Sequence, residues 1–176
     1  MTPGMCVGGH AYGELPGCHW CGRLSYYKPV KPLIIGEQPS KNGNPDTPVS
    51  GRIGERLAEF MGITYMEYDM LFERVNLLPI REEYTGSGKE WDADRAKARA
   101  IELSAAFESG QVVLLLGKRA STAFGLSDEY FLRHKVNGAD VYVIPHPSGL
   151  NRWYNDESNK LMAQEFLRAI IERVYQ

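Results

Sequence analysis

The sequence lacks long hydrophobic runs and has no excess of charge of either sign. No apolar stretch approaches the roughly 18 residues of a membrane span, so we expect no contact with a membrane. With 22 acidic residues against 20 lysines and arginines, the formal net charge is −2. This balance excludes a protein that holds nucleic acid by bulk electrostatic attraction, although it allows a local basic patch. The first residues also lack the basic and then apolar pattern of a secretion signal, and we therefore expect a cytoplasmic protein.

Cysteine is scarce, with three residues in the chain, and a disulfide framework is not expected in a cytoplasmic protein. The cysteines lie near two histidines, so that four potential metal ligands fall close together: Cys6, His10, Cys18 and Cys21. Residues 1–27 show little helical or strand periodicity. We predict that a zinc ion on these four side chains, or with His19 in place of His10, organises this segment. The alternative is a flexible arm with incidental cysteines.

The rest of the chain alternates short apolar runs with helical patterns. The apolar runs predict strands at residues 31–36, 71–78, 111–117 and 141–144, and the helical patterns predict helices at 51–62, 91–108, 118–125 and 157–175. Strands that alternate with helices indicate an α/β protein, here a three-layer α/β/α sandwich with a central four-stranded parallel sheet. We expect this domain at residues 28–176, with 1–27 as a short metal-stabilised segment packed on the core.

Two loops that follow predicted strands carry polar residues suited to a binding site. Gly36-Glu37-Gln38-Pro39-Ser40 follows the first strand, and the segment from His146 to Arg152 follows the last. In parallel sheets, ligands bind at the carboxyl ends of the strands. No phosphate-binding glycine fingerprint opens any predicted helix, which argues against a flavodoxin-like nucleotide-binding domain. The basic residues of the helix at 91–108 are interpreted as a solvated face.

These motifs resemble those of the uracil-DNA glycosylase superfamily. That superfamily carries G-[EQIM]-x-P-x after its first strand and [HN]-P-S after its last. Pro48–Gly54 is similar to the P-F-V-G-R-A-G run of the iron–sulfur branch, and Val112–Gly125 is similar to the third strand and following helix of that branch. Val75–Leu78 occupies the place of the base-reading residue. The resemblance covers the chain from about Cys18 to the C-terminus.

The resemblance implies an enzyme that flips a base out of DNA and hydrolyses its N-glycosidic bond, leaving an abasic site. His146 is expected to donate a hydrogen bond to the departing base, and Asn76 to read the edge of the base. Glu37, Gln38 and Asp46 are alternative groups for positioning the water. The expected base-binding set also includes Gly36, Pro39, Ser40 and Val49. DNA is the expected partner, and we expect a monomer.

The segment Pro-Ser-Gly-Leu-Asn-Arg after His146 resembles the P-S-G-L-S-R wedge of the mismatch-specific branch. The resemblance implies that Leu150 fills the gap left by the flipped base and that Arg152 reaches the opposite strand or a phosphate. Lys118, at the start of a predicted helix, is a further candidate for binding phosphate. The expected DNA-binding residues are Ser148, Gly149, Leu150, Asn151, Arg152 and Lys118.

Two departures from the superfamily pattern enlarge the expected base pocket. Strict uracil enzymes have a tyrosine that blocks a 5-methyl group where this chain has Ser40, and the iron–sulfur branch has a stacking phenylalanine where this chain has Val49. We therefore predict excision of a modified, 5-substituted pyrimidine, such as a hypermodified phage base, in antiviral defence. The alternatives are uracil repair with Tyr65 or Phe72 supplying the stack, transfer of the sugar to another nucleophile, and non-catalytic binding of modified bases, since Gln38 cannot deprotonate water.

The cofactor prediction depends on another departure. The iron–sulfur branch has a C-x-x-C pair before its first strand, which Cys18 and Cys21 match, but its other two cysteines have no counterpart here. Cys6 and a histidine in their place suit zinc better than a cluster. Zinc is therefore the expected cofactor, with an iron–sulfur cluster or no metal as the alternatives.

Overall fold

The computed structural model describes residues 30–39, 46–78 and 91–175. The expected zinc ligands, His19, Ser40 and the expected boundary between residues 27 and 28 lie outside the described residues, and what was predicted for them stays a prediction. Within the described part of the chain, no helix is long and apolar enough to cross a membrane.

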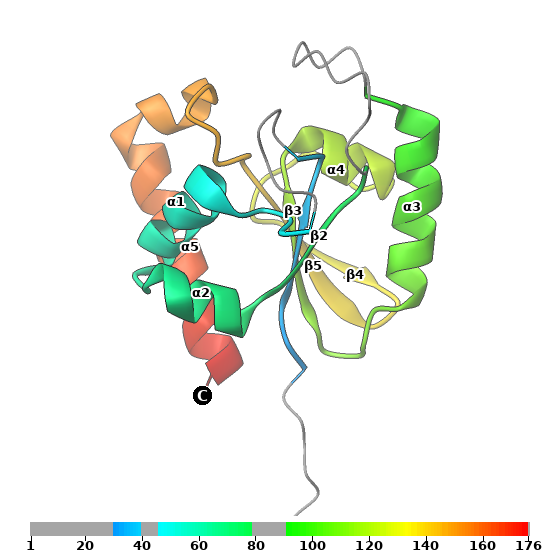
Figure 1. Cartoon of the computed structure of the whole chain (residues 1–176), viewed down its shortest axis with the longest axis horizontal. Helices are drawn as coiled ribbons and strands as arrows, with labels where there is room; N and C mark the ends of the chain where they lie inside the picture. Colours follow the sequence, from blue (N-terminus) through cyan, green and yellow to red (C-terminus); the bar gives the residue numbers. More distant parts are fainter. Residues whose placement is uncertain (1–29, 40–45, 79–90, 176) are drawn as a thin grey trace, which may run out of the picture.

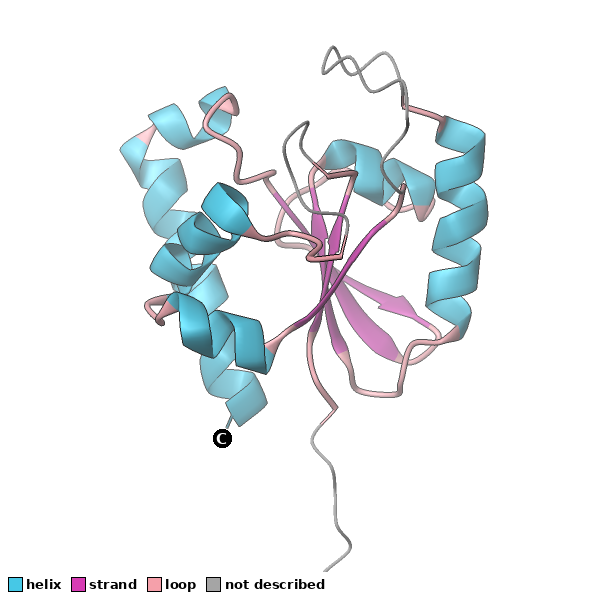
Figure 2. Cartoon of the chain, viewed as in Figure 1, coloured by secondary structure: helices cyan, strands magenta, loops and turns pink. Residues whose placement is uncertain are grey.

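The described residues form a five-stranded sheet with helices on both faces (Figures 1 and 2). The strands are β1 (Leu33–Gly36), β2 (Glu73–Asn76), β3 (Val112–Leu116), β4 (Arg133–Val136) and β5 (Ala139–Ile144). Their order in the sheet is β2-β1-β3-β5-β4. Neighbours among β2, β1, β3 and β5 are parallel, whereas β4 is antiparallel to β5. The predicted layered α/β fold is confirmed, and the prediction of four strands is wrong.

The additional strand, β4, forms a hairpin with β5. The turn between them is Asn137-Gly138, with φ values of 48° and 87°. A two-residue type I′ turn requires positive φ at both positions, and Asn-Gly is its favoured sequence. β4 has the sequence RHKV and alternates exposed with half-buried residues, so it lacks the apolar run by which the other strands are predicted. The Asn-Gly pair is the sequence signal that marks this hairpin.

Helices cover the two faces of the sheet in separate groups. The helices are α1 (Gly51–Met61), α2 (Tyr65–Leu71), α3 (Ala93–Ala105), α4 (Lys118–Ala123) and α5 (Glu157–Tyr175), with a 3-10 turn, η2, at Arg152–Asn155. Helices α1, α2 and α5 lie on one face, and α3 and α4 lie on the other (Figure 1). Helix α2 was not predicted from the sequence, although a capping box marks its start. The Thr64 hydroxyl accepts a hydrogen bond from the Glu67 N–H at 3.2 Å, and the Glu67 carboxylate accepts one from the Thr64 N–H at 2.7 Å.

The central strands supply side chains to both core layers. On β1, Ile34 packs in the layer that contains α1 and α5, and Ile35 packs in the layer that contains α3 and α4. Every residue of β3 and β5 is buried, because helices cover both faces of these strands. Burial on both sides explains why continuous apolar runs, rather than alternating ones, predict these strands.

The parallel pairing brings the two predicted motif loops to one end of the sheet. Gly36, at the end of β1, pairs in register with Asn76, at the end of β2. Leu116 of β3 pairs with Ile144 of β5, and the N–H of Gly117 donates to the Ile144 carbonyl at 2.8 Å. The residues that follow each of these strands are therefore neighbours in space.

Candidate active site

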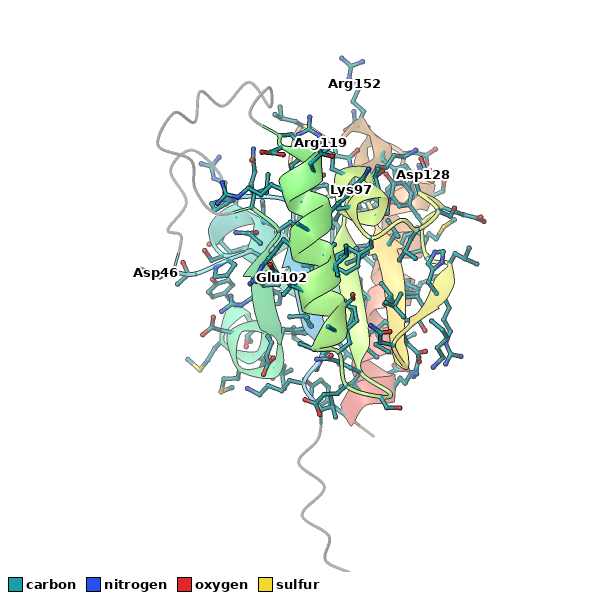
Figure 3. All side chains as sticks on the ribbon, turned by 90° about the vertical axis from the view of Figure 1, so that its right-hand side faces the viewer. Asp46, Lys97, Glu102, Arg119, Asp128 and Arg152 are labelled. Carbon is teal, nitrogen blue, oxygen red and sulfur yellow. The ribbon has the colours of Figure 1, made fainter. Side chains whose placement is uncertain are left out.

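A small cavity opens at the carboxyl ends of the central strands. It is lined by Gly36, Glu37, Gln38, Pro39, Thr47, Val49, Ser50, Ile53, Asn76, Leu116 and His146. The fold thus brings together most of the predicted base-binding and catalytic residues. Asp46, the third candidate for positioning the water, is exposed and is not among the lining residues (Figure 3).

The side of the cavity formed by Asn76 and Val49 depends on a close approach at Gly36. A Cβ atom added to Gly36 would lie 2.5 Å from Oδ1 of Asn76 and 3.0 Å from Cγ2 of Val49. A side chain at this position would therefore push both residues away from their present places. Glycine at the end of β1 allows the Asn76 amide and the Val49 side chain to lie against the backbone of the motif loop.

Val49 itself has an unusual backbone conformation. Its φ is 53°, in the left-handed region that β-branched residues rarely adopt. Its side chain is 8% exposed, and its carbonyl accepts a hydrogen bond from the Tyr68 hydroxyl at 3.1 Å. Such a conformation costs about 1–3 kcal/mol and persists where the surrounding structure holds it, which is common at functional sites.

The aromatic side chains considered as substitutes for the stacking phenylalanine lie elsewhere. The rings of Tyr65 and Phe72 pack against Tyr68, with centroid distances of 5.9 and 5.6 Å. Among the described residues that line the cavity there is no phenylalanine, tyrosine or tryptophan. Val49 therefore occupies the stacking position without an aromatic replacement from this part of the chain.

The side of the cavity formed by Glu37 and His146 depends on a second glycine, Gly117. Gly117 has φ 88°, and an added Cβ atom would lie 2.8 Å from Oε1 of Glu37 and 3.2 Å from Cβ of His146. The absence of a side chain at Gly117 lets the Glu37 carboxylate and the His146 side chain, which follow two different strands, both lie close to the Gly117 backbone. The sequence analysis did not identify Gly117, although it follows the most apolar strand directly.

The hydrogen bonds of His146 determine which nitrogen carries its proton. The N–H of Ser148 donates to Nδ1 of His146 at 3.2 Å, so Nδ1 is unprotonated and the neutral ring carries its proton on Nε2. Burial lowers the pKa of His146, and the nearby charge of Arg119 lowers it further. The imidazole is therefore neutral at pH 7 and offers Nε2–H as a hydrogen-bond donor.

Glu37 lies in an environment that favours uptake of a proton. Burial raises the pKa of its carboxyl group, while the charge and the backbone N–H of Arg119 oppose this shift. Nη1 of Arg119 lies 3.7 Å from the carboxylate, and its guanidinium stacks over Trp91 at 5.7 Å. A carboxylate whose pKa is raised towards neutrality is suited to act as a general base.

The loop after His146 is held by two side chains that pack beneath it, Arg56 and Tyr154. The Arg56 guanidinium, on α1, donates to the carbonyls of Pro147 and Ser148 at 3.3 and 3.2 Å. It also lies over the Tyr154 ring at 4.7 Å. The Tyr154 hydroxyl donates to the Pro145 carbonyl at 2.8 Å. No local motif marks Arg56, because its partners lie about 90 residues further along the chain.

The predicted wedge and phosphate-binding residues differ in their surroundings. Leu150 is 93% exposed, and Arg152 points away from the body of the protein (Figure 3). Asn151 instead supports the loop, because its side chain donates to the His146 carbonyl at 2.9 Å. Lys118 pairs with Asp128 at 2.6 Å and lies over the Tyr130 ring. Within the described ranges, no group of three or more histidine, cysteine or acidic residues is placed to hold a metal ion.

The model of the uracil-DNA glycosylase superfamily matches residues 25–171. No curated protein matches the chain. Members of the superfamily are DNA glycosylases, and the match covers both motif loops and every element of the sheet. The chain belongs to the uracil-DNA glycosylase superfamily.

Proposed function

We propose that the protein hydrolyses the N-glycosidic bond of a modified, 5-substituted pyrimidine in DNA and leaves an abasic site. The observation that carries this proposal is the convergence of Asn76, His146 and Glu37 on one cavity at the carboxyl end of the sheet. An amide, a neutral imidazole and a carboxylate provide the three functions that base excision needs. They read the base, stabilise it as it leaves, and activate water.

Bond cleavage places negative charge on the departing base. The bond between C1′ of the sugar and the base nitrogen breaks, and the base takes the electron pair. Nε2–H of His146 donates to an oxygen of the base and stabilises this charge without transferring a proton beforehand. A fixed donor in a site that excludes water typically contributes about 10²–10³-fold in rate.

The water that completes the reaction is assigned to Glu37. Its carboxylate accepts one proton from the water while the oxygen bonds to C1′, which yields the abasic sugar. Gln38 lines the same cavity and orients the water through its amide. This division of roles suits the raised pKa of Glu37.

Extrusion of the base is assigned to the loop after His146. Leu150 is exposed to solvent on a loop whose first residues are held in place by hydrogen bonds from Arg56 and Asn151. An exposed apolar side chain on a held loop is suited to enter the base stack in place of the flipped nucleotide. Arg152, which also projects outwards, contacts the DNA backbone.

The lack of an aromatic side chain at the expected stacking position supports a substrate base with a large substituent. Val49 lies there, and no described aromatic residue lines the cavity. Loss of one stacked ring costs about 1–3 kcal/mol of base binding, so a substrate that binds well must gain contacts elsewhere. Ser40, in place of a tyrosine, leaves the 5-position open. Because such bases occur in phage DNA, we assign the activity to antiviral defence.

We also propose a zinc ion in residues 1–27, held by Cys6, His10, Cys18 and Cys21. This proposal rests on the spacing of the four side chains in the sequence. Metal analysis of the purified protein by mass spectrometry should give one zinc per chain, and Cys18→Ser should abolish it. Iron with acid-labile sulfide would instead identify a cluster.

Formation of abasic sites tests the proposed activity. Matched duplexes carry uracil, 5-hydroxymethyluracil, 5-hydroxymethylcytosine or glucosylated 5-hydroxymethylcytosine, and alkali cleaves the DNA wherever an abasic site forms. We expect cleavage of the duplexes with large substituents and its loss in His146→Ala. Cleavage of uracil alone would identify a repair enzyme and contradict the enlarged pocket. Binding of a modified duplex without cleavage would identify a non-catalytic protein.

A further inference from the structure

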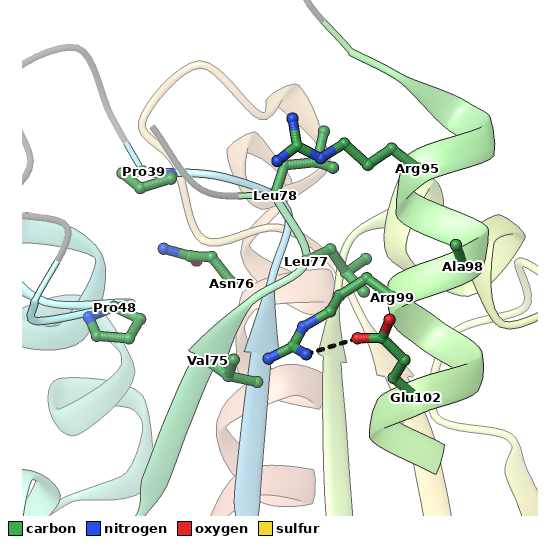
Figure 4. Close-up of a pocket in the computed structure, with 10 residues that line it drawn as sticks. All are labelled: Pro39, Pro48, Val75, Asn76, Leu77, Leu78, Arg95, Ala98, Arg99 and Glu102. Atoms are coloured by element: carbon green, nitrogen blue, oxygen red, sulfur yellow. Dashed lines mark hydrogen bonds and ion pairs between the residues drawn. The ribbon is translucent and has the colours of Figure 1, made fainter. Parts of the chain in front are cut away.

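A second hollow lies beside the base cavity, between β2 and α3 (Figure 4). Its volume is about 500 Å³, within the range of roughly 300–1,000 Å³ that is typical of small-ligand pockets. Pro39 and Asn76 line both hollows. The two spaces therefore adjoin at the residue that we assign to reading the base.

The wall formed by α3 carries two arginines. Arg95 and Arg99 extend from the helix towards β2 (Figure 4). Arg99 donates to the Glu102 carboxylate at 2.8 Å. In the described part of the chain, no carboxylate pairs with the Arg95 guanidinium. Ala98, which lies between them along the helix, adds only a methyl group, so space is left between α3 and β2.

The lining combines an apolar floor with polar groups along one wall. Val75, Leu77 and Leu78 form the apolar part, and the α3 wall offers two guanidinium donors and the Glu102 acceptor. A sugar ring has the same division, with C–H faces that pack on apolar side chains and hydroxyls that both donate and accept. A phosphate fits less well, because its oxygens only accept hydrogen bonds and cannot donate to the Glu102 carboxylate, whereas a hydroxyl can.

The chemistry of a pyrimidine places its 5-position next to the edge that an amide reads. The exocyclic group at position 4 belongs to that edge, and position 5 is the adjacent ring atom. A substituent at position 5 therefore leaves the base beside Asn76, where the base cavity meets the second hollow.

We propose that this hollow binds a hydroxyl-rich substituent of hexose size at the 5-position of the flipped pyrimidine. Arg95 and Arg99 donate hydrogen bonds to its hydroxyls, and Glu102 accepts one. The inference rests on the proposed function and names the class of substrate. Arg95 and Arg99 are exposed, as expected of a solvated face, and they also form a wall of this hollow.

Binding to a cleavage-deficient protein tests the inference separately from catalysis. In the His146→Ala background, dissociation constants are measured for duplexes with 5-hydroxymethylcytosine and with its glucosylated form. We expect tighter binding of the glucosylated duplex. Arg95→Ala and Arg99→Ala should each reduce this preference about tenfold, since each removes a charge-assisted hydrogen bond. Ala98→Trp should abolish the preference by filling the space. Lys97→Ala, an exposed cation on the same helix outside the lining, is the matched control and should leave the preference unchanged (Figure 3).

The outcomes separate this inference from the proposed function. Equal weakening of both duplexes by the arginine variants would show that the hollow binds backbone phosphate, and would overturn the inference. Equal binding of both duplexes by His146→Ala without a further substitution would overturn the inference as well. If the wild-type enzyme forms abasic sites in the glucosylated duplex and Ala98→Trp cleaves it equally well, the inference fails and the proposed function stands. If no duplex is cleaved but the binding preference follows the variants, the proposed hydrolysis fails and the hollow keeps its ligand. Thermal unfolding of each variant confirms that it is folded.

Discussion

The two ends of the sheet each hold a carboxylate beside basic side chains, but the pKa values of the two carboxyl groups are shifted in opposite directions. Asp140, near the start of β5, is 1% exposed and forms ion pairs with Arg133, Lys135 and Arg173. Burial alone would raise its pKa, but hydrogen bonds from these cations outweigh it and hold the pKa well below the usual range. Glu37, after β1, has the more distant Arg119, and burial raises its pKa.

This difference separates a structural carboxylate, Asp140, from Glu37, to which we assign the water. Three cations compensate Asp140 fully, so it stays ionised and joins β4, β5 and α5. Glu37 is compensated in part, and burial therefore makes its carboxyl group take up a proton more readily than an exposed glutamate does. A pKa that is shifted by burial and only weakly opposed by a charged partner is the pattern expected of a catalytic acid or base.

Of the changes that test this difference between the two carboxylates, Glu37→Gln is expected to have the largest effect, which is on kcat. The change removes the general base and should lower kcat by about 10²–10⁴-fold on any duplex that the wild type cleaves. In the wild type, activity should fall as the pH drops through the raised pKa of Glu37, because the base becomes protonated. The variant should lack this dependence. Glu55→Gln, at an exposed position on α1, is the control. Full activity of Glu37→Gln, with loss in Asp46→Asn, would assign the water to Asp46.

Asp140→Asn should have the second largest effect, on stability rather than on activity. Loss of the charge-assisted hydrogen bonds should lower the free energy of unfolding by about 2–3 kcal/mol, measured by urea denaturation. Asp128→Asn, which breaks the exposed pair with Lys118, should have a much smaller effect, because solvent screens a pair at the surface. Equal effects of the two changes would show that burial of Asp140 does not strengthen its ion pairs.

The stability difference for Asp140 should depend on pH with a defined sign. The folded-state pKa is lowered, so the contribution is present above the unfolded-state value of about 3.9. It is lost as the pH falls through the folded-state pKa, because both states are then protonated. The wild type and Asp140→Asn should therefore converge in stability only under strongly acidic conditions. A stability difference that stays constant into this range would contradict the lowered pKa.

Arg56→Met should lower activity, although Arg56 does not contact the reacting atoms in the proposed mechanism. The change keeps most of the side-chain length but removes the hydrogen bonds to Pro147 and Ser148. Because the loop carries both His146 and Leu150, we expect kcat/KM to fall about tenfold through loss of orientation. The dependence of binding on salt should stay as in the wild type. A shallower salt dependence would mean that Arg56 contacts phosphate instead.

The smallest effect is expected from Arg119→Met, as a displacement of the pH profile. The Arg119 charge lowers the pKa values of both Glu37 and His146. Its removal should raise both values and move the acidic limb of the activity profile to higher pH. The measurement is kcat/KM across the acidic range, with Lys97→Met as a control for loss of an exposed cation. An unchanged limb would show that the arginine does not act on the groups that titrate.

The parts of the fold that the sequence predicted are those with strong local patterns. The apolar runs of β3 and β5 and the long helix α5 lie where the patterns placed them, because burial on both faces or a long helical stretch leaves a direct periodic signal. The hairpin strand β4 and the short helix α2 depend on turn and cap residues instead. Such signals occupy two to four residues and are easily passed over beside a longer pattern.

The candidate site shows the same division. Gly36, Glu37, Asn76 and His146 could be named from motifs at strand ends, and the structure brings them to one cavity. Arg56, Arg119 and Gly117 contact site residues that are distant in sequence, and spacing along the chain does not predict these contacts. The arginines of α3 are exposed, as the sequence predicted, but periodicity does not show which part of a polar face borders a neighbouring strand.

The sequence by itself determined the layered α/β fold, the superfamily and the motif residues, because each is written in local composition and in the order of short segments. The tertiary structure alone decided which carboxylate is compensated and which stays available to react. It also decided that Arg95 and Arg99 line the second hollow, which adjoins the candidate site at Pro39 and Asn76. These properties depend on distances and burial across strands that the chain brings together only by folding, and the energy of a charge depends on these quantities.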